Sequence, residues 1–387
     1  MNKEQRKTKQ KEQATKSRVQ RTKKVFSVDY TLLLILSGVL CFGLVMLLSA
    51  STPAGRTLHD NAYYFFIRQL AFVFVGLACL YIAFRFDYHN YDKFIKKAYF
   101  VCIFLLILVQ IPGVGLELNG AKRWIDLKVF QLQPSELAKP CIAIFFASMI
   151  VGGKYDIKKY KQLFMFAVAL APIVLFLVLE PHLSCLAVVV IIAICVLIVG
   201  GTKVIPLLLT CALLLAVGTP IVWKFFPVRW ERITTFINPF ADVQGAGYQV
   251  VQSLYAIGSG GIFGRGLGQS VQKYAYLPEP YNDFIFAVIC EELGLIGAIA
   301  VIALFTILVI RIFQIARNAP DTFGRLIATG IGTQVGIQAL LNVAVATSSF
   351  PNTGMSLPFF SYGGTSIIVL LAEMGILLNI ASQSKLK

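Results

Sequence analysis

Long apolar runs alternate with short polar segments along the whole chain of 387 residues. A helix needs about 20 predominantly apolar residues to cross the hydrocarbon core of a bilayer. Ten runs approach that length, and we interpret each as a membrane span: 29–51, 67–85, 98–113, 137–152, 163–179, 183–200, 204–226, 284–310, 324–346 and 361–381. The pattern therefore predicts an all-α polytopic membrane protein with about ten transmembrane helices.

The composition agrees with this prediction. Hydrophobic residues make up 57% of the chain and charged residues only 14%, whereas soluble domains are about 45–50% apolar and about 25% charged. The mean hydropathy is +0.74. No segment between the runs is large enough to fold alone, so we expect one membrane domain, residues 29–382, after a tail of residues 1–28.

The formal net charge of +16 is unevenly distributed. Residues 1–28 hold ten Lys and Arg against two Glu, so this tail alone carries +8. A polybasic segment before a first span is typical of a topology signal near anionic headgroups, which we prefer to a nucleic-acid site. We expect the tail to be disordered and cytoplasmic. The even-numbered spans then lead into further Lys- and Arg-rich loops, so both termini are predicted in the cytoplasm.

Cysteine and histidine indicate no metal chemistry. The eight cysteines stand singly in apolar runs without a paired spacing, which is typical of small buried hydrophobic residues. The three histidines lie in separate loops or at loop edges. We therefore predict no metal site built from these residues and no disulfide.

Two outward segments interrupt the runs. In the first, residues 113–136, Pro134, Ser135 and Glu136 have the order expected at a helix start. The second, the outer loop 227–283, lies between spans 7 and 8 and is predicted to be extracytoplasmic. Loops of this length are functional or disordered, and this one holds too many aromatic and aliphatic residues for disorder. We expect it to pack over the outer mouth of the bundle.

Asp283 is the main candidate for chemistry. It stands where the polar end of the outer loop meets the apolar run that begins at Phe284. A carboxylate at the lip of a membrane helix keeps access to water while its surroundings lower the dielectric, a setting that suits a general base. Glu279, in the same loop, is a candidate substrate contact.

Basic residues gather on the predicted outer side, where the positive-inside rule disfavours them. One explanation is that they reach towards lipid headgroups; the other is that they bind a phosphorylated lipid. Lys139 favours the second, because a cation one turn inside a span is costly unless it is paired, and Glu136 is its candidate partner. The cations are Lys122, Arg123, Lys139, Arg229, Arg232, Arg265 and Lys273.

Two further groups have structural interpretations. The glycine-rich stretch 258–268 matches no phosphate-binding spacing, so we favour tight turns and close backbone packing over anion contact. Glu291 and Glu292 lie about 80° and about 180° around a helix from Asp283, and we do not expect either to pair with it. A buried polar network that includes Glu180 and Glu373 is the alternative.

The chain resembles a known family, the shape, elongation, division and sporulation (SEDS) proteins, and is more similar to members of the FtsW type than to RodA. The likeness extends over residues 29–382. It depends on the segments 119–125, 133–139, 238–240, 247–254, 283–286, 291–294 and 357–364. One departure is that His182 stands where the family commonly has an aspartate, so any role of that aspartate does not transfer.

The resemblance implies an enzyme of the bacterial cytoplasmic membrane that polymerises lipid II into glycan strands beside a class B penicillin-binding transpeptidase and other division proteins. It implies that Asp283 is the catalytic aspartate and that Arg123 and Lys139 belong to the basic outer cavity. Inverting transfer from a polyprenyl diphosphate needs one base and a cationic site. No cofactor is certain; a divalent cation, Mg²⁺ or Mn²⁺, at the diphosphate stays open.

Two other functions remain alternatives. A lipid II flippase would also use ten spans, an intramembrane Lys and an anionic lipid ligand, but it needs a polar path across the whole bilayer. The polar residues found here concentrate on one side, which favours the enzyme. A non-catalytic division scaffold would leave Asp283 and the basic residues unexplained.

Overall fold

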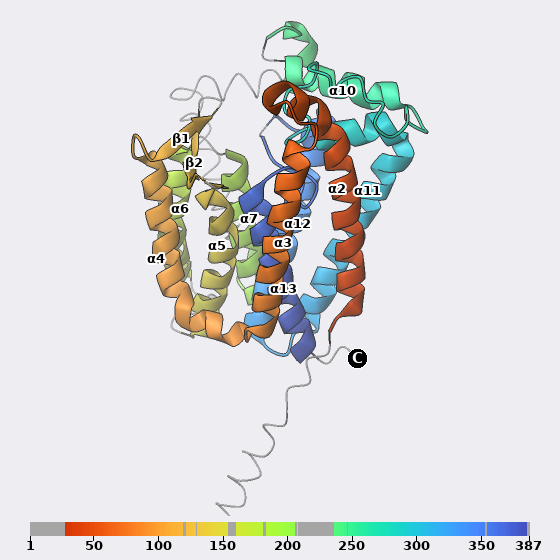
Figure 1. The fold of residues 1–387 in the computed structure, drawn as a ribbon. Helices are drawn as coiled ribbons and strands as arrows, with labels where there is room; N and C mark the ends of the chain where they lie inside the picture. Colours follow the sequence, from red (N-terminus) through yellow and green to blue (C-terminus); the bar gives the residue numbers. More distant parts are fainter. Residues whose placement is uncertain are drawn as a thin grey trace, which may run out of the picture.

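The computed structural model describes residues 28–118, 121–128, 130–153, 160–180, 183–205, 207, 236–245, 247–352 and 354–384. In this part of the chain, nine helices of 18 to 33 residues form one bundle (Figure 1). They are α2 (Tyr30–His59), α3 (Tyr64–Arg85), α4 (Tyr91–Gln110), α5 (Pro134–Val151), α6 (Tyr160–Leu179), α7 (Leu183–Gly200), α11 (Ile285–Arg317), α12 (Thr322–Ala346) and α13 (Gly364–Gln383).

Each of these helices matches one predicted run. Six of them (α2, α3, α5, α11, α12 and α13) are long and apolar enough to cross a membrane, and Leu163–Leu179 and Ser184–Gly200 are shorter apolar segments. The predicted run 204–226 lies almost entirely outside the described residues, as does the tail 1–28 except for Val28. The described helices therefore agree with the predicted all-α polytopic architecture.

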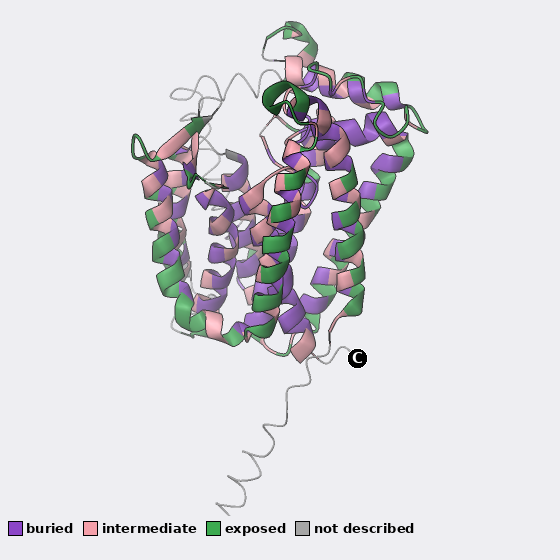
Figure 2. Cartoon of the chain, in the orientation of Figure 1, coloured by how far each residue is buried: buried purple, intermediate pink, exposed green. Residues whose placement is uncertain are grey.

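The outer surface of the bundle is apolar. On α3, Ile67, Phe74 and Tyr81 recur every seven residues and are exposed, while Val73 and Leu80 are buried. Exposed residues follow the outer sides of α3 and α4 (Figure 2). A band of large exposed hydrophobic side chains is expected where a protein surface is surrounded by the acyl chains of lipids.

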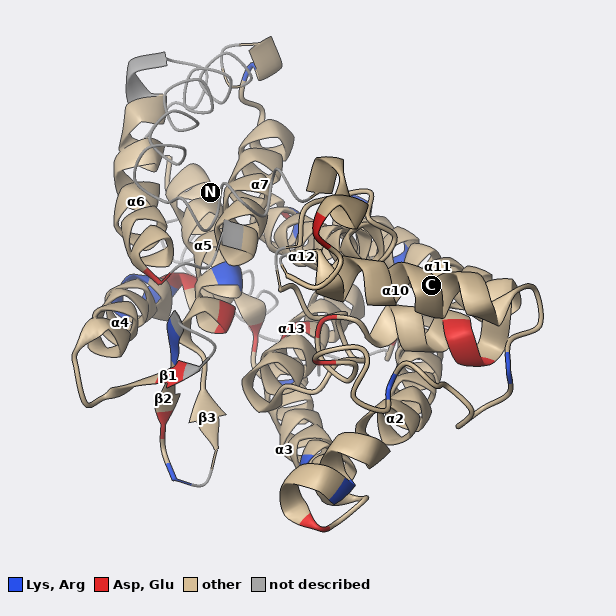
Figure 3. Cartoon of the chain, turned by 90° about the horizontal axis from the view of Figure 1, so that it is seen from above, with Lys and Arg blue, Asp and Glu red and all other residues tan. Residues whose placement is uncertain are grey.

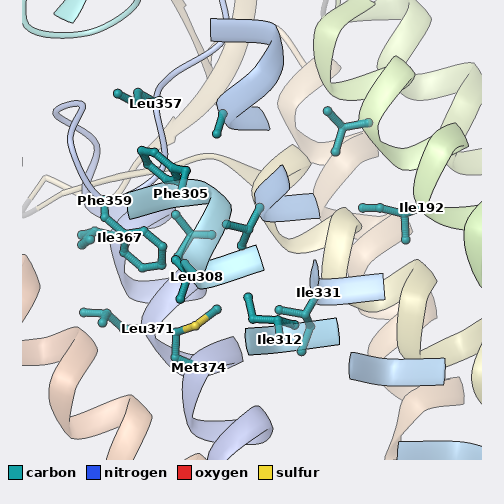
Figure 4. Packing of buried hydrophobic residues seen from close by; sticks show 14 of the residues in the cluster. Ile192, Phe305, Leu308, Ile312, Ile331, Leu357, Phe359, Ile367, Leu371 and Met374 are labelled. Carbon is teal, nitrogen blue, oxygen red and sulfur yellow. The ribbon is translucent and has the colours of Figure 1, made fainter. Parts of the chain in front are cut away.

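The interior is closely packed around α11, α12 and α13. Leu308 and Ile312 of α11 meet Leu371 and Met374 of α13 in this cluster (Figure 4). At Gly375 a Cβ atom would lie 2.3 Å from the carbonyl oxygen of Leu80. Glycine is therefore required where α3 crosses α13, as is common where membrane helices approach closely.

A small antiparallel sheet covers one end of the bundle, which the sequence analysis did not predict. Its strands are β1 (Gly115–Leu118), β2 (Ala121–Asp126) and β3 (Gln131–Leu132), in the order β1-β2-β3. Thr365 connects the sheet to α13 through two hydrogen bonds. Its hydroxyl donates to the Gln131 carbonyl at 2.9 Å and accepts from the Gln133 amide at 3.1 Å. The strands are too short for an alternation of hydrophobic and polar residues to be recognised in the sequence.

The outer loop occupies the same end of the bundle. Its described part contains the 3-10 turn η2 (Pro239–Asp242) and helix α10 (Tyr248–Gly260). We call the end with the sheet and α10 the loop face, and the end where α2 begins and α13 finishes the termini face (Figure 1). The predicted packing of the loop over one mouth of the bundle agrees with this position.

The glycine-rich stretch packs against a break in α11. Gly294 interrupts the helix with φ 66° and ψ −161°. Across the break, the Leu295 amide donates a hydrogen bond of 2.9 Å to the Gly261 carbonyl, and the Gly266 amide donates one of 2.9 Å to the Glu292 carbonyl. A Cβ at Gly264 would lie 2.2 Å from the Glu292 carbonyl oxygen. The glycines thus allow close backbone packing, the role favoured from the sequence.

Candidate active site

Asp283 lies on the loop face, directly before α11 begins. Its carbonyl accepts a hydrogen bond of 2.8 Å from the Asn342 side chain of α12. The preceding carbonyl, of Asn282, accepts one of 2.5 Å from the Ser361 hydroxyl. The Tyr362 amide also donates to the Tyr281 carbonyl at 2.9 Å. Two distant segments therefore fix the backbone that carries the candidate base.

The Asp283 carboxylate is half-buried and faces Gly354. A Cβ added at Gly354 would lie 3.2 Å from Asp283 Oδ2, and Gly354 has a φ of +66°. Any other residue at this position would crowd the carboxylate and strain the backbone. The loop before α13 therefore contributes directly to the shape of the site.

Aromatic rings support the loop on the side of α3. Tyr281 stacks on Phe65 with 4.6 Å between ring centroids, and Phe65 meets Tyr362 edge-on at 5.1 Å. Burial, with the negative charge of Glu279, raises the pKa of the Tyr281 hydroxyl above its usual value. Glu279 itself accepts a hydrogen bond of 2.6 Å from Asn282. Glu279 is thus placed four residues from Asp283 in a well-supported turn.

Lys139 and Glu136 form the pair expected from the sequence. The Lys139 ammonium lies 2.6 Å from Glu136 Oε1, and the Lys139 side chain has no exposed surface. Both residues belong to the first turns of α5, where Pro134 starts the helix as predicted. A buried cation in a membrane bundle is normally retained for a functional reason.

Arg123 lies on β2, in the small sheet at the loop face. Its Nε donates to the Glu180 carbonyl at 3.3 Å, and its charge also interacts with the Glu180 carboxylate. Cys185 of α7 is within electrostatic range of Lys139, Glu136 and Glu180. Charged residues gather above α5 beside the sheet when the loop face is viewed from above (Figure 3). The structure thus brings Arg123 and Lys139 into one region.

Of the other predicted cations within the described residues, Arg265 lies 3.8 Å from the Glu291 carboxylate. Lys122 follows the alternation of β2 and pairs in register with Glu117 of β1. Arg229 and Arg232 lie outside the described residues. Their roles remain predictions.

Lys273 is held by a network of its own. Its ammonium donates to Glu292 Oε1 at 2.7 Å, to the Gly268 carbonyl at 2.8 Å and to the Ser49 hydroxyl at 3.0 Å. An ammonium has three donors, so all are engaged. A cavity of 270 Å³ between α2 and the loop adjoins Lys273. For Lys273 to contact a diphosphate, as the sequence suggested, it would have to release one of these partners.

Glu291 and Glu292 are both buried and bind the outer loop. The predicted network with Glu180 and Glu373 is wrong, because Glu180 interacts with Arg123 and Glu373 with Lys139 and Gln334 instead. Glu291 accepts hydrogen bonds from the Ser270 hydroxyl at 2.5 Å and the Val271 amide at 2.9 Å. Together with the Lys273–Glu292 pair, these contacts join the first part of α11 to the loop. The segment that follows Asp283 is therefore rigidly connected to the outer loop.

Asn342 was missed in the sequence analysis. Besides Asp283, it contacts the Met355 carbonyl at 2.6 Å, which places it between the two loops of the site. The available signal was a series of side-chain amides, Gln334, Gln338 and Asn342, spaced by four residues in an apolar helix. Such a spacing places polar groups on one buried face.

The described residues contain no group of three His, Cys, Asp or Glu side chains placed to hold a metal ion. A divalent cation at the diphosphate remains a prediction.

Comparison with known families now defines the class of protein. The model of the FtsW, RodA and SpoVE family, described as cell cycle protein, matches residues 30–386, and this chain belongs to that family. Stage V sporulation protein E of Bacillus subtilis is 38% identical over 365 residues, which cover 94% of this chain and 100% of that protein. The predicted family is confirmed.

Other relatives agree in sequence and in fold. A probable peptidoglycan glycosyltransferase FtsW of Trichlorobacter lovleyi is 41% identical, with 92% of this chain and 94% of that protein covered. The crystal structure of Thermus thermophilus RodA matches with a TM-score of 0.70 at 26% identity, over 94% of this chain and 100% of that one. A chain in a peptidoglycan synthase complex that coordinates polymerization and crosslinking matches with 0.78 at 27%, over 93% and 99%. The polytopic membrane fold is confirmed.

Proposed function

We propose that this protein is a peptidoglycan glycosyltransferase that polymerises lipid II into glycan strands during cell division or sporulation. The observation that carries the proposal is the position of Asp283, a half-buried carboxylate fixed at the loop face by Asn342. Arg123 and the buried Lys139–Glu136 pair lie towards the same face. The name of the Trichlorobacter lovleyi relative supports this activity.

The reaction is an inverting substitution at a sugar carbon. Asp283 takes the proton of the 4-hydroxyl of one lipid-linked GlcNAc, whose oxygen forms the new bond to C1 of a MurNAc. The bond from C1 to the diphosphate oxygen breaks, and polyprenyl diphosphate leaves. Cations near the leaving group stabilise its developing charge, a task for Arg123 and Lys139, with Lys122, Arg229, Arg232 and Lys273 as further candidates.

The orientation follows from charge. Basic residues such as Arg85, Lys93, Arg317 and Arg325 stand at helix ends on the termini face, as the bounds of their helices indicate. Because cytoplasmic loops of membrane proteins are enriched in Lys and Arg, we place the termini in the cytoplasm and the loop face outside, in the bacterial cytoplasmic membrane. Asp283 then meets substrate at the outer leaflet.

A class B penicillin-binding transpeptidase is the proposed partner, with other division proteins. The similarity to a chain of a complex that couples polymerization with crosslinking supports such an assembly. Polymerisation and crosslinking act on the same strand, so a shared complex keeps the product of one step close to the next.

The experiment that tests the function is reconstitution in proteoliposomes with lipid II added to one leaflet. A glycosyltransferase converts that lipid II to glycan polymer, and a cognate class B transpeptidase is expected to increase the yield. A flippase would move the lipid to the other leaflet without polymer, and a scaffold would do neither. Transfer across the bilayer without any polymer, with or without the transpeptidase, would refute the proposal.

A further inference from the structure

Three buried amide side chains form a stripe along α12. Gln334, Gln338 and Asn342 are spaced by four residues, so they share one face of the helix at intervals of about 6 Å along its axis. All three are almost fully buried. Buried amides are unfavourable unless they have hydrogen-bond partners, so this stripe requires a physical explanation.

The stripe connects the two ends of the candidate site. At the loop face, Asn342 contacts the backbone of Asp283. At the inner end, Gln334 lies beside Glu373 of α13, which is within electrostatic range of Lys139 and Glu136. A line of polar groups thus leads from the candidate base to the buried ion pair.

Many polar atoms on this line have no protein partner. Within the residues that the structure describes, no hydrogen bond reaches Asn342 Oδ1, Gln338 Oε1 or Glu136 Oε2, and the side chains of Gln334 and Glu373 have no hydrogen-bond partner beyond each other. Buried polar groups are satisfied in nearly all proteins, and internal water is the usual partner when protein groups are absent. Atoms that follow one another along a helix face fit a file of water molecules.

The inner end also carries an excess of negative charge. Glu136 and Glu373 provide two carboxylates, and Lys139 provides one ammonium. The neighbouring Glu180 interacts with Arg123. An unpaired carboxylate in the interior of a membrane protein is costly, and a bound proton on Glu373 removes that cost.

We propose that Gln334, Gln338 and Asn342 bind a chain of ordered water molecules that connects Asp283 to Glu373, where an exchangeable proton is held. The proposal rests on the proposed function, because it gives the proton taken by Asp283 a way out of the site. One proton enters the water chain from the Asp283 carboxyl in each turnover. One leaves from the Glu373 end to an oxygen of the departing diphosphate, so the charge of the protein is restored.

The water chain is tested by radical footprinting, which does not depend on activity. Hydroxyl radicals made from bound water by an X-ray pulse oxidise side chains next to that water. Met355 is 3% exposed and its Sδ lies 3.7 Å from Gln338 Nε2, whereas Met46 on α2 is fully buried and serves as the reference. We expect Met355 to be oxidised several-fold faster than Met46 and to lose this excess in Gln338→Leu.

A matched control and a second measurement complete the test. Ile337→Leu, at a half-buried neighbouring position of α12, is expected to keep the labelling of Met355. In infrared spectra, a protonated carboxyl C=O band that shifts in D₂O should disappear in Glu373→Gln. Equal labelling of Met355 and Met46, or a band that persists in Glu373→Gln, would overturn the proposal.

Kinetics then separate a proton path from a structural role. Gln338→Leu is expected to lower kcat roughly tenfold while KM for lipid II stays nearly constant. An unchanged kcat would contradict the path. Failure of the proposed function would show itself differently, as transfer of lipid II across the bilayer without polymer, or as polymerisation that does not depend on Asp283. Labelling of Met355 and the infrared band would still report on the water chain.

Discussion

The side-chain amide of Asn342 donates a hydrogen bond of 2.8 Å to the backbone carbonyl of Asp283, across 59 positions of sequence. The same amide donates to Met355, so one residue of α12 holds both loops that border the carboxylate. The candidate base is thus placed by a helix that contributes no charge to the site.

Asn342→Leu should therefore impair both catalysis and stability. The two carbonyls would lose their donor, which costs about 1–3 kcal/mol for each buried group left unsatisfied. We expect kcat to fall at least about tenfold, because small misplacements of catalytic groups have large effects. Polymerase assays and the thermal midpoint in detergent are the measurements. Wild-type kcat in this variant would show that Asp283 does not need this support.

Gly354→Ala tests the space beside the carboxylate. The added Cβ would lie 3.2 Å from Asp283 Oδ2 at a backbone φ of +66°. Gly113→Ala is the matched control, since Gly113 also has a positive φ, of +89°, but no atom lies within 4 Å of its Cβ position. Both variants should lose about 1 kcal/mol of stability, and only Gly354→Ala should lose most of its polymerase activity. Equal activity in the two variants would contradict this role of Gly354.

Lys273→Met distinguishes a structural from a substrate-binding lysine. All three donors of Lys273 are engaged within the protein, and its partner Glu292 is fully buried. Removing one member of a buried ion pair costs about 3–5 kcal/mol. We therefore expect a clear fall in the unfolding midpoint, recovered in part by Lys273→Met combined with Glu292→Leu.

The opposite result would support a substrate-binding role for Lys273. A raised KM for lipid II with an unchanged unfolding midpoint would show that the ammonium exchanges its protein partners for the diphosphate. Measuring both quantities on the same preparation decides between the two roles.

The termini face contains a cluster with a predictable pH dependence. Burial alone would raise the pKa of Asp321, but hydrogen bonds from Tyr88, the Gly324 amide and His89 lower it below its usual value. A carboxyl whose pKa is lowered by folding stabilises the protein fully above its unfolded pKa of about 3.9. That stability is lost as the pH falls through the folded pKa.

Thermal unfolding in detergent between about pH 6 and about pH 3 measures this contribution. Asp321→Asn should be less stable than the wild type at the upper end, and the difference should shrink as the medium becomes acidic. A difference that stays constant over this range would exclude ionisation of Asp321 as its source.

The hydrophobic pattern was sufficient to locate the nine long helices of the described bundle, because each span must be apolar over most of its length. The strands β1 to β3 were missed, since β3 has only two residues and its alternation is invisible. The break at Gly294 was also missed, because one glycine in an apolar run does not reveal that a distant loop supplies the hydrogen bonds there.

Local spacing predicted some of the site and not the rest. The Glu136–Lys139 pair is three residues apart and followed from helix geometry. The contacts of Asp283 with Asn342 and Gly354, and those of Lys273 with Ser49, join segments far apart in sequence, and only tertiary packing determines them. The resemblance supplied Asp283 as catalytic, while the structure supplies the neighbours that support it.

The most direct measurement of the central claim compares Asp283→Asn with Asp60→Asn in polymerisation of purified lipid II. The two substitutions are the same, and Asp60 is exposed with a φ of +50°, a conformation that asparagine tolerates. If Asp283 is the general base, its variant should fold and insert normally but lose at least about a hundredfold in rate, whereas Asp60→Asn should retain wild-type activity. A folded Asp283→Asn protein that polymerises lipid II at the wild-type rate would contradict the account.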